Sequence, residues 1–285
     1  MVALSRAFAE PAGMSLRLLV LPLLLLMLVG GSVLLGERLF ESMLFRPVTG
    51  AEIQPERLGI EGEDVFLQTE DGVRIHGFWL PVENAQKALL FLHGNGGNAS
   101  FSLPRASQFL RFGVSVLVLD YRGYGLSEGV PTEVGVYQDA QAGLEYLVEV
   151  RGFPEDRILV LGQSLGGAVA VDLAQEKSLG GVILESTFDS LAGVVHSRVP
   201  FVDRLLSGRF DSDRKILLLE SPILFLHGDR DGTVPLESGK RLFALAPEPK
   251  EFVTIEGARH NDVAEVGGRL YFDRVGEFVA SMGAR

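Results

Sequence analysis

The chain has 285 residues, no cysteine and a formal net charge of −11. Its length fits one α/β domain of about 200 to 250 residues with an appended segment. Without cysteine there can be no disulfide, thiolate metal site or cysteine nucleophile. The acidic balance, with scattered lysines and arginines, argues against a nucleic-acid partner.

An uncharged apolar run covers residues 18–35. As a helix it would span about 27 Å, close to the hydrocarbon core of a bilayer, which is about 30 Å thick. A secretory h-region is usually shorter, about 7 to 15 residues, and no A-x-A site follows this run. We therefore expect residues 1–36 to hold a single-pass N-terminal membrane anchor; a cleaved signal and a buried helix are the alternatives.

The residues that flank this run do not determine its orientation in the membrane, because basic residues are nearly balanced on its two sides. We expect the domain to lie on the outer, or periplasmic, side of the membrane. Met14 is a second possible start of the native chain. Residues 37–63 are mixed in composition and rich in turn formers, so we expect a connector between the anchor and a domain at residues 64–285.

The domain is predicted to open with an antiparallel hairpin of residues 64–69 and 73–81, because Asp71-Gly72 favours a tight turn between two β-rich runs. Short, continuous apolar runs then alternate with segments of helical period, a pattern typical of a parallel sheet covered by helices. The predicted strands are 88–92, 114–119, 158–161, 182–184, 223–226 and 252–255. The predicted helices are 138–151, 165–175, 236–246 and 267–282. This is an α/β fold.

An insertion at about residues 186–221 is too short for a large lid, so we expect a small cap. Its apolar residues either shape an acyl pocket or pack on the sheet. They are Phe188, Phe201, Val202, Leu205, Leu206 and Phe210.

Two serines have the G-x-S-x-G spelling, Ser164 and Ser127. A nucleophile needs a sharp turn between a strand and a helix, with glycines to relieve crowding and backbone N–H groups for an oxyanion. Ser164 follows a predicted strand and precedes a predicted helix. Ser127 is separated from its strand and is followed by Pro131, so it is predicted to lie in a loop. We therefore expect Ser164 to be the nucleophile.

Five histidines are candidates for the base: His76, His93, His196, His227 and His260. In this architecture the order along the chain is serine, acid, histidine, each after a strand. His260 follows the last predicted strand and leaves room for an acid before it. Asp229 and Asp231 compete for that role, and Asp231 is preferred because it lies deeper in its loop, just before a helix.

The remaining requirement is a pair of oxyanion donors. The backbone N–H of Leu165 begins the helix after the nucleophile, and the glycine-rich loop at residues 93–98 contains Asn95 as the second candidate. His93 is expected to brace this loop.

Several motifs occur together in the chain: HGNGGN at 93–98, DYRGYGLSEG at 120–129, GQSLGG at 162–167, ESTFDS at 185–190, HGDRDGTVP at 227–235 and GARHND at 257–262. In combination they resemble the α/β-hydrolase superfamily from about residue 64 to the C-terminus. The similarity is to a membrane-tethered branch with a minimal cap, which includes depalmitoylases and prolyl-oligopeptidase-like hydrolases.

This resemblance implies the α/β-hydrolase fold, with a mostly parallel central sheet and helices on both faces. It implies hydrolysis of ester, thioester, amide or peptide bonds without a cofactor or metal. Ser164, Asp231 and His260 carry over as the catalytic triad, and Asn95 and Leu165 as the oxyanion donors. The cysteine-rich N-terminus of animal depalmitoylases is missing here, which leaves the substrate open. We expect a small-molecule or acylated-protein substrate with lipid-like character.

Two other classes of protein fit part of the sequence. G-x-G-x-x-A at 94–99 with Asp120 after the next strand is typical of a dinucleotide-binding oxidoreductase. The preceding hairpin and the order of Ser164, Asp231 and His260 argue against it. The second alternative is a non-catalytic binding protein on the same fold.

Overall fold

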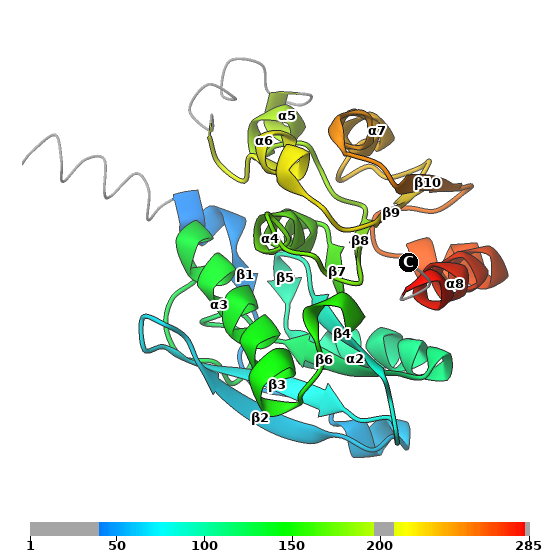
Figure 1. The fold of residues 1–285 in the computed structure, drawn as a ribbon. Helices are drawn as coiled ribbons and strands as arrows, with labels where there is room; N and C mark the ends of the chain where they lie inside the picture. The colour runs from blue at the N-terminus through cyan, green and yellow to red at the C-terminus, as the bar shows by residue number, and fades with distance from the viewer. Residues whose placement is uncertain (1–39, 197–207, 283–285) are drawn as a thin grey trace, which may run out of the picture. The chain divides into compact units, whose positions relative to one another are not determined.

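The computed structural model describes residues 40–196 and 208–282 (Figure 1). The chain divides into two compact units, Met1–Leu44 and Phe45–Arg285. Residues 40–44, the described part of the first unit, are helical. The apolar run at 18–35 lies outside the described residues. Within the described ranges, no helix combines the length and apolar character needed to cross a bilayer.

The second unit is built on an eight-stranded sheet with the order β10-β9-β8-β7-β4-β6-β3-β2. Strand β3 pairs antiparallel with both β2 and β6, and all other neighbours in this sheet are parallel. The strands are β2 Glu63–Gln68, β3 Arg74–Leu80, β4 Lys87–Leu92, β6 Val114–Leu119, β7 Ile158–Gln163, β8 Gly181–Glu185, β9 Ile223–Gly228 and β10 Lys250–Ile255. The predicted hairpin and mostly parallel sheet are therefore confirmed.

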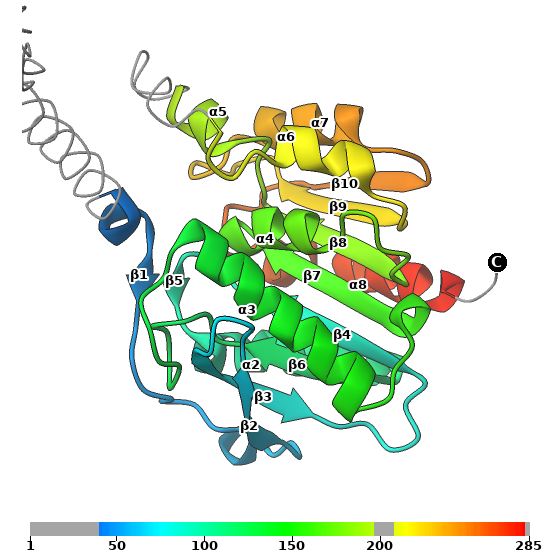
Figure 2. The same cartoon turned by 60° about the vertical axis from the view of Figure 1, so that its left-hand side comes forward.

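Helices cover both faces of the sheet, as predicted. Helices α3 and α4 lie on one face, and α2 and α8 on the other (Figure 2). Their bounds are α2 Ala99–Ala106, α3 Glu133–Glu145, α4 Leu165–Leu173 and α8 Val263–Ser281; α7, Leu236–Leu245, packs on β9. The inner strands β4 and β6 are buried on both faces, which explains their unbroken apolar sequences.

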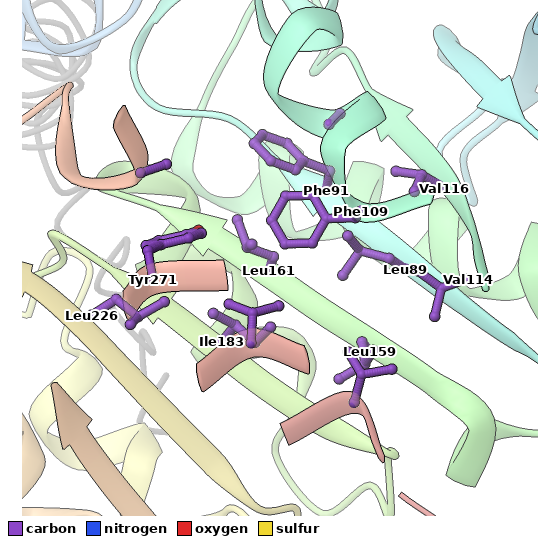
Figure 3. Packing of buried hydrophobic residues seen from close by; sticks show 14 of the residues in the cluster. Leu89, Phe91, Phe109, Val114, Val116, Leu159, Leu161, Ile183, Leu226 and Tyr271 are labelled. Carbon is purple, nitrogen blue, oxygen red and sulfur yellow. The ribbon is translucent and has the colours of Figure 1, made fainter. Parts of the chain in front are cut away.

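A continuous apolar core lies between the sheet and the pair α2 and α8 (Figure 3). Phe91 of β4 meets Phe109 at a ring-centroid distance of 6.3 Å, and Leu161 and Ile183 extend the contact along β7 and β8. Burying such side chains contributes about 1.5 to 3 kcal/mol each. This core fixes the strand ends that carry the polar residues described below.

One helix was not predicted, and two others begin earlier than expected. Helix α2 was not among the predicted helices; it contains Pro104 and begins at the cap Asn98, whose side chain accepts a hydrogen bond from the N–H of Ser100. Helix α3 starts five residues before the expected position, at Glu133, because Thr132 caps it. It continues beyond Glu145 as a π-helical turn, Tyr146–Val150. Helix α8 begins at Val263 instead of residue 267 and is kinked at Gly268, where φ is 45°.

The insertion is described only at its two ends, which form α5 Leu191–His196 and α6 Ser212–Lys215. Phe188 and Phe210 are buried, and Phe210 packs on Phe45 with a centroid distance of 6.3 Å. The other four apolar residues of the insertion, Phe201, Val202, Leu205 and Leu206, lie outside the described residues.

Candidate active site

Ser164 forms the turn between β7 and α4. Its φ of 54° and ψ of −116° are rare for a residue with a side chain. A Cβ on Gly162 would lie 2.2 Å from the carbonyl oxygen of Gly166, and a Cβ on Gly166 would lie 2.2 Å from that of Leu92. Both glycines of the motif are therefore a steric requirement of this turn.

The end of β8 holds the turn in place. The N–H of Ser164 donates to the carbonyl of Glu185 at 2.8 Å, and the hydroxyl of Thr187 donates to the carbonyl of Ser164 at 2.9 Å. The strained backbone is thus restrained from two sides, by residues of the ESTFDS motif. The Ser164 side chain remains partly exposed.

A chain of short contacts joins three segments that are far apart in sequence. His260 Nε2 lies 2.9 Å from Ser164 Oγ, and His260 Nδ1 lies 2.7 Å from Asp231 Oδ2. Ser164, Asp231 and His260 follow β7, β9 and β10, whose carboxyl ends meet at one edge because these strands are parallel. The arrangement lets His260 accept a proton from the hydroxyl while the carboxylate fixes the opposite ring nitrogen.

The Asp231 carboxylate is fully hydrogen-bonded. Its Oδ1 accepts from the N–H groups of Thr233 and Val234, each at 2.8 Å. Its Oδ2 faces His260, and the Nε2 atom of His227 lies 3.4 Å away. Burial opposes ionisation, but the bonds from His227 and His260 outweigh it and hold the pKa of Asp231 below its ordinary value.

Asp229, the competing acid, is placed differently. It is exposed, and its Oδ1 accepts from the N–H of Gly257 at 2.6 Å. The structure therefore brings Asp231, and not Asp229, to His260.

A pocket of about 500 Å³ opens at Ser164. It is lined by Asn95, the expected oxyanion donor, as well as by Ser164 and His260. The N–H of Leu165 is the first of α4, and the first N–H groups of a helix have no acceptor within the helix. The rest of the lining includes the predicted glycine-rich loop, through His93, Gly94, Gly96 and Asn98, and residues to which the sequence analysis gave no role: Phe101, Ser102, Gln163, Thr233 and Asn261. Gln163 and Asn261 lie within the GQSLGG and GARHND motifs, and their place beside Ser164 and His260 was the signal that could have identified them.

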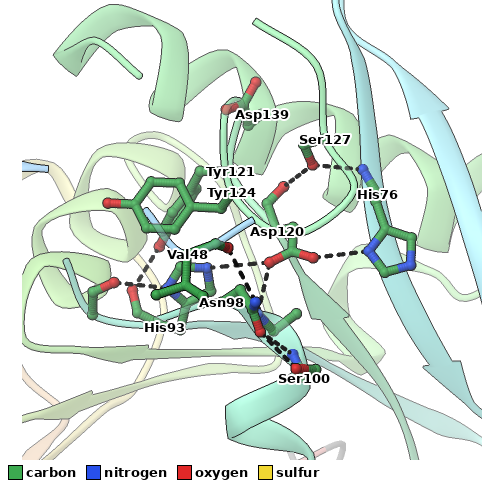
Figure 4. Close-up of polar contacts among 12 residues, drawn as sticks. Val48, His76, His93, Asn98, Ser100, Asp120, Tyr121, Tyr124, Ser127 and Asp139 are labelled. Atoms are coloured by element: carbon green, nitrogen blue, oxygen red, sulfur yellow. Dashed lines mark hydrogen bonds and ion pairs between the residues drawn. The ribbon is translucent and has the colours of Figure 1, made fainter. Parts of the chain in front are cut away.

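The other candidate residues have structural contacts. The Ser127 hydroxyl accepts from the N–H of His76 at 2.8 Å and donates to the carbonyl of Asp120 at 3.2 Å (Figure 4). Asp120 is fully buried and accepts from the N–H of Ala99 and a ring nitrogen of His76, so its carboxylate is not available to a ribose. The side chain of His196 lies outside the described residues. The described residues contain no group of three histidine or carboxylate side chains arranged to hold a metal ion.

Comparisons with known proteins agree with this architecture. Residues 83–212 match the family described as serine aminopeptidase, S33. The α/β hydrolase domain-containing protein WAV2 of Arabidopsis thaliana is 32% identical over 275 residues, covering 85% of this chain and 89% of that protein. The uncharacterized protein Rv2307c of Mycobacterium tuberculosis is 37% identical over 222 residues, with coverages of 76% and 79%. The solved structure of the Pyrococcus furiosus esterase Pf2001 superposes with a TM-score of 0.69 and 26% identity, covering 84% of this chain and 99% of that one.

Proposed function

The chain belongs to the α/β-hydrolase superfamily, and from that premise we propose that it is a serine hydrolase acting through Ser164, His260 and Asp231. The observation that carries the proposal is the unbroken line of contacts from hydroxyl to imidazole to carboxylate, at 2.9 and 2.7 Å. Such a line at a strained strand-to-helix turn is what nucleophilic catalysis by serine requires.

In the proposed reaction Ser164 Oγ attacks the carbonyl carbon of an ester, thioester or amide, and its proton passes to His260 Nε2. The N–H groups of Asn95 and Leu165 stabilise the tetrahedral oxyanion. The C–O, C–S or C–N bond then breaks, and the leaving group takes the proton from His260. Water, deprotonated by His260, attacks the acyl-enzyme and releases the acid with regeneration of the Ser164 hydroxyl.

A fluorophosphonate probe tests the nucleophile directly. The wild type should be labelled on the peptide that contains Ser164, and Ser164→Ala should not be labelled. Ser127→Ala is the matched control, because it removes the other serine with the same spelling and should keep the label. Labelling of Ser127, or no labelling of a folded wild type, would refute the proposal; the second result would leave the alternative of a non-catalytic binding protein.

The substrate proposal is an acylated protein or a lipid-like ester. Support comes from the esterase named among the solved structures and from the apolar run at 18–35, which suits action near lipid. The described lining of the pocket is mixed, with Phe101 beside Gln163 and Asn261, and neither Phe188 nor Phe210 reaches it. A series of p-nitrophenyl esters of increasing acyl length tests this, and a flat profile of kcat/KM would argue against a lipid preference.

Membrane attachment through residues 18–35 is part of the same proposal. The full chain should remain in the membrane pellet after extraction with alkaline carbonate. Release into the supernatant would exclude a transmembrane anchor, and loss of the N-terminal peptide from the native protein would indicate a cleaved signal.

A further inference from the structure

The loop that carries Asn95, the proposed oxyanion donor, is held by its carbonyl groups. Three successive carbonyls are engaged. The Tyr121 hydroxyl donates to the carbonyl of His93 at 3.0 Å (Figure 4). His93 Nδ1 donates to the carbonyl of Gly94 at 2.7 Å, and the Tyr124 hydroxyl donates to the carbonyl of Asn95 at 2.7 Å. Because a carbonyl only accepts, His93 must carry its proton on Nδ1.

These bonds determine where the Asn95 N–H points. The peptide unit is planar, so fixing the Gly94 carbonyl also fixes the Asn95 N–H on the opposite side of the same plane. In the same way, the hydrogen bond to the Asn95 carbonyl fixes the peptide plane between Asn95 and Gly96. The atom that would stabilise an oxyanion is therefore held from both sides before any substrate binds, which is the arrangement that electrostatic catalysis needs.

The connector takes part in the same set of bonds. Strand β1, Arg46–Pro47, pairs in parallel with β5, Gly96–Gly97. The N–H of Arg46 donates to the Asn95 carbonyl at 2.9 Å, so this one oxygen receives two donors. On its other side the connector is bonded to the loop after β6, since the N–H of Gly125 donates to the carbonyl of Val48 at 2.9 Å.

The surroundings keep the donors in their working state. Tyr121 and Tyr124 are fully buried, and burial raises the pKa of both phenols above their ordinary value. Their rings lie 4.6 and 5.1 Å from the ring of His93. Burial lowers the pKa of His93, which favours the neutral ring.

We propose that Tyr124 and strand β1 jointly position the Asn95 N–H, so that the segment next to the N-terminal unit is part of the catalytic apparatus. This inference rests on the proposed hydrolase function. Tyr124 acts through the Asn95 peptide and is a positioning residue. It would not contact the substrate.

The test uses full-length protein and p-nitrophenyl butyrate. Tyr124→Phe removes one hydroxyl and should lower kcat about 10- to 100-fold, less than or comparable to the loss of a whole oxyanion donor, while KM changes little. Arg46→Pro removes the second donor to the same oxygen. Arg46→Pro should also lower kcat, because both donors are needed to hold the carbonyl, and the double variant should lose more than either single variant.

Tyr137→Phe is the matched control, since its hydroxyl donates to Glu133 in α3, away from the pocket, and kcat should be unchanged. The inference would be overturned if Tyr124→Phe kept the wild-type kcat or changed only KM. It would also be overturned if Tyr137→Phe lost as much kcat as Tyr124→Phe. If Tyr124→Phe does not fold, Arg46→Pro decides, and an unchanged kcat would then reject the role of β1. Labelling of wild-type Ser164 by fluorophosphonate separates these outcomes from failure of the hydrolase proposal.

Discussion

Asp229 and Asp231, both in the loop after β9, lie two positions apart in sequence but in different environments. Asp231 is buried, accepts two backbone N–H bonds and lies 2.7 Å from His260, whereas Asp229 is exposed and accepts from Gly257. A carboxylate held this firmly can orient an imidazole and stabilise its charged form. An exposed carboxylate in a turn can do neither.

We predict that Asp231→Asn lowers kcat on the order of 10⁴-fold, because the amide keeps the shape but cannot stabilise the imidazolium of His260 or select its tautomer. Asp229→Asn is the matched control and should change kcat by about twofold or less, as expected for a surface substitution. Steady-state kinetics with p-nitrophenyl butyrate measures both. Similar losses in the two variants would contradict the assignment of the acid.

The positions of Ser164, Asp231 and His260 could be predicted because each follows a strand that is recognisable from its apolar run. Parallel strands end at the same edge, so residues that follow them come together, and the position of Asp231 deeper in its loop decided between it and Asp229. The contacts of Tyr121 and Tyr124 could not be predicted. Both belong to a motif visible in the sequence, but their hydroxyl partners are backbone carbonyls of a loop about 30 residues away, which no local pattern encodes.

The strands were easier to predict than the helices for a physical reason. Buried parallel strands are continuous apolar runs, whereas α2 contains Pro104 and serines, which are poor helix formers. Tertiary contacts compensate: Asp120 accepts the N–H of Ala99 at 2.6 Å, and Ala99 and Leu103 are fully buried. Because α2 is stabilised by contacts with the rest of the domain, its own sequence has little of the pattern that predicts a helix.

The hairpin of β2 and β3 contains a buried histidine between two carboxylates. His76 of β3 contacts Asp120 through Nδ1 and Asp64 through Nε2, both at 2.8 Å. Burial opposes the charged ring, but the hydrogen bonds to Asp120 and Asp64 outweigh it and raise the pKa of His76. The folded protein therefore binds this proton more tightly than the unfolded chain does.

This shift predicts how stability depends on pH. Because the folded pKa of His76 exceeds the unfolded value of about 6.5, its contribution is fully present below pH 6.5 and is lost as pH rises through the folded pKa. Urea unfolding of wild type and His76→Gln should give a difference in free energy that is largest near pH 6 and declines at higher pH. In the Asp64→Asn background the folded pKa of His76 is less raised, so the decline should be smaller and should be complete at lower pH. Parallel curves for wild type and His76→Gln would contradict this account.

Two helices on the same face of the sheet, α2 and α8, are joined to its centre by one polar cluster. Arg105 of α2 and Tyr271 of α8 both donate to Oε2 of Glu185, at the end of β8. Glu185 is fully buried, and its Oε1 has no hydrogen-bond partner in the part of the chain that the structure describes. This cluster lies directly beside the turn at Ser164, because the Glu185 carbonyl accepts the N–H of Ser164.

The parallel sheet and its two covering layers could be predicted from sequence, but this polar cluster could not. Arg105 lies in the helix that was not predicted, and Tyr271 occupies an apolar position of α8. A long-range ionic contact of this kind depends on how the helices pack, and no periodic pattern in the sequence predicts it. Burying these charges also costs desolvation free energy, which the contact must offset.

We predict that Arg105→Met lowers the free energy of unfolding by about 3 to 5 kcal/mol, because Glu185 would remain buried without its cation. The triple variant Arg105→Met, Glu185→Leu, Tyr271→Phe removes every polar group of the cluster and should recover most of that loss, as apolar replacements of buried ion pairs often do. Urea unfolding of the wild type and both variants measures the difference. A triple variant no more stable than Arg105→Met would mean that the cluster itself, and not the avoidance of an unpaired charge, holds α2 and α8 to the sheet.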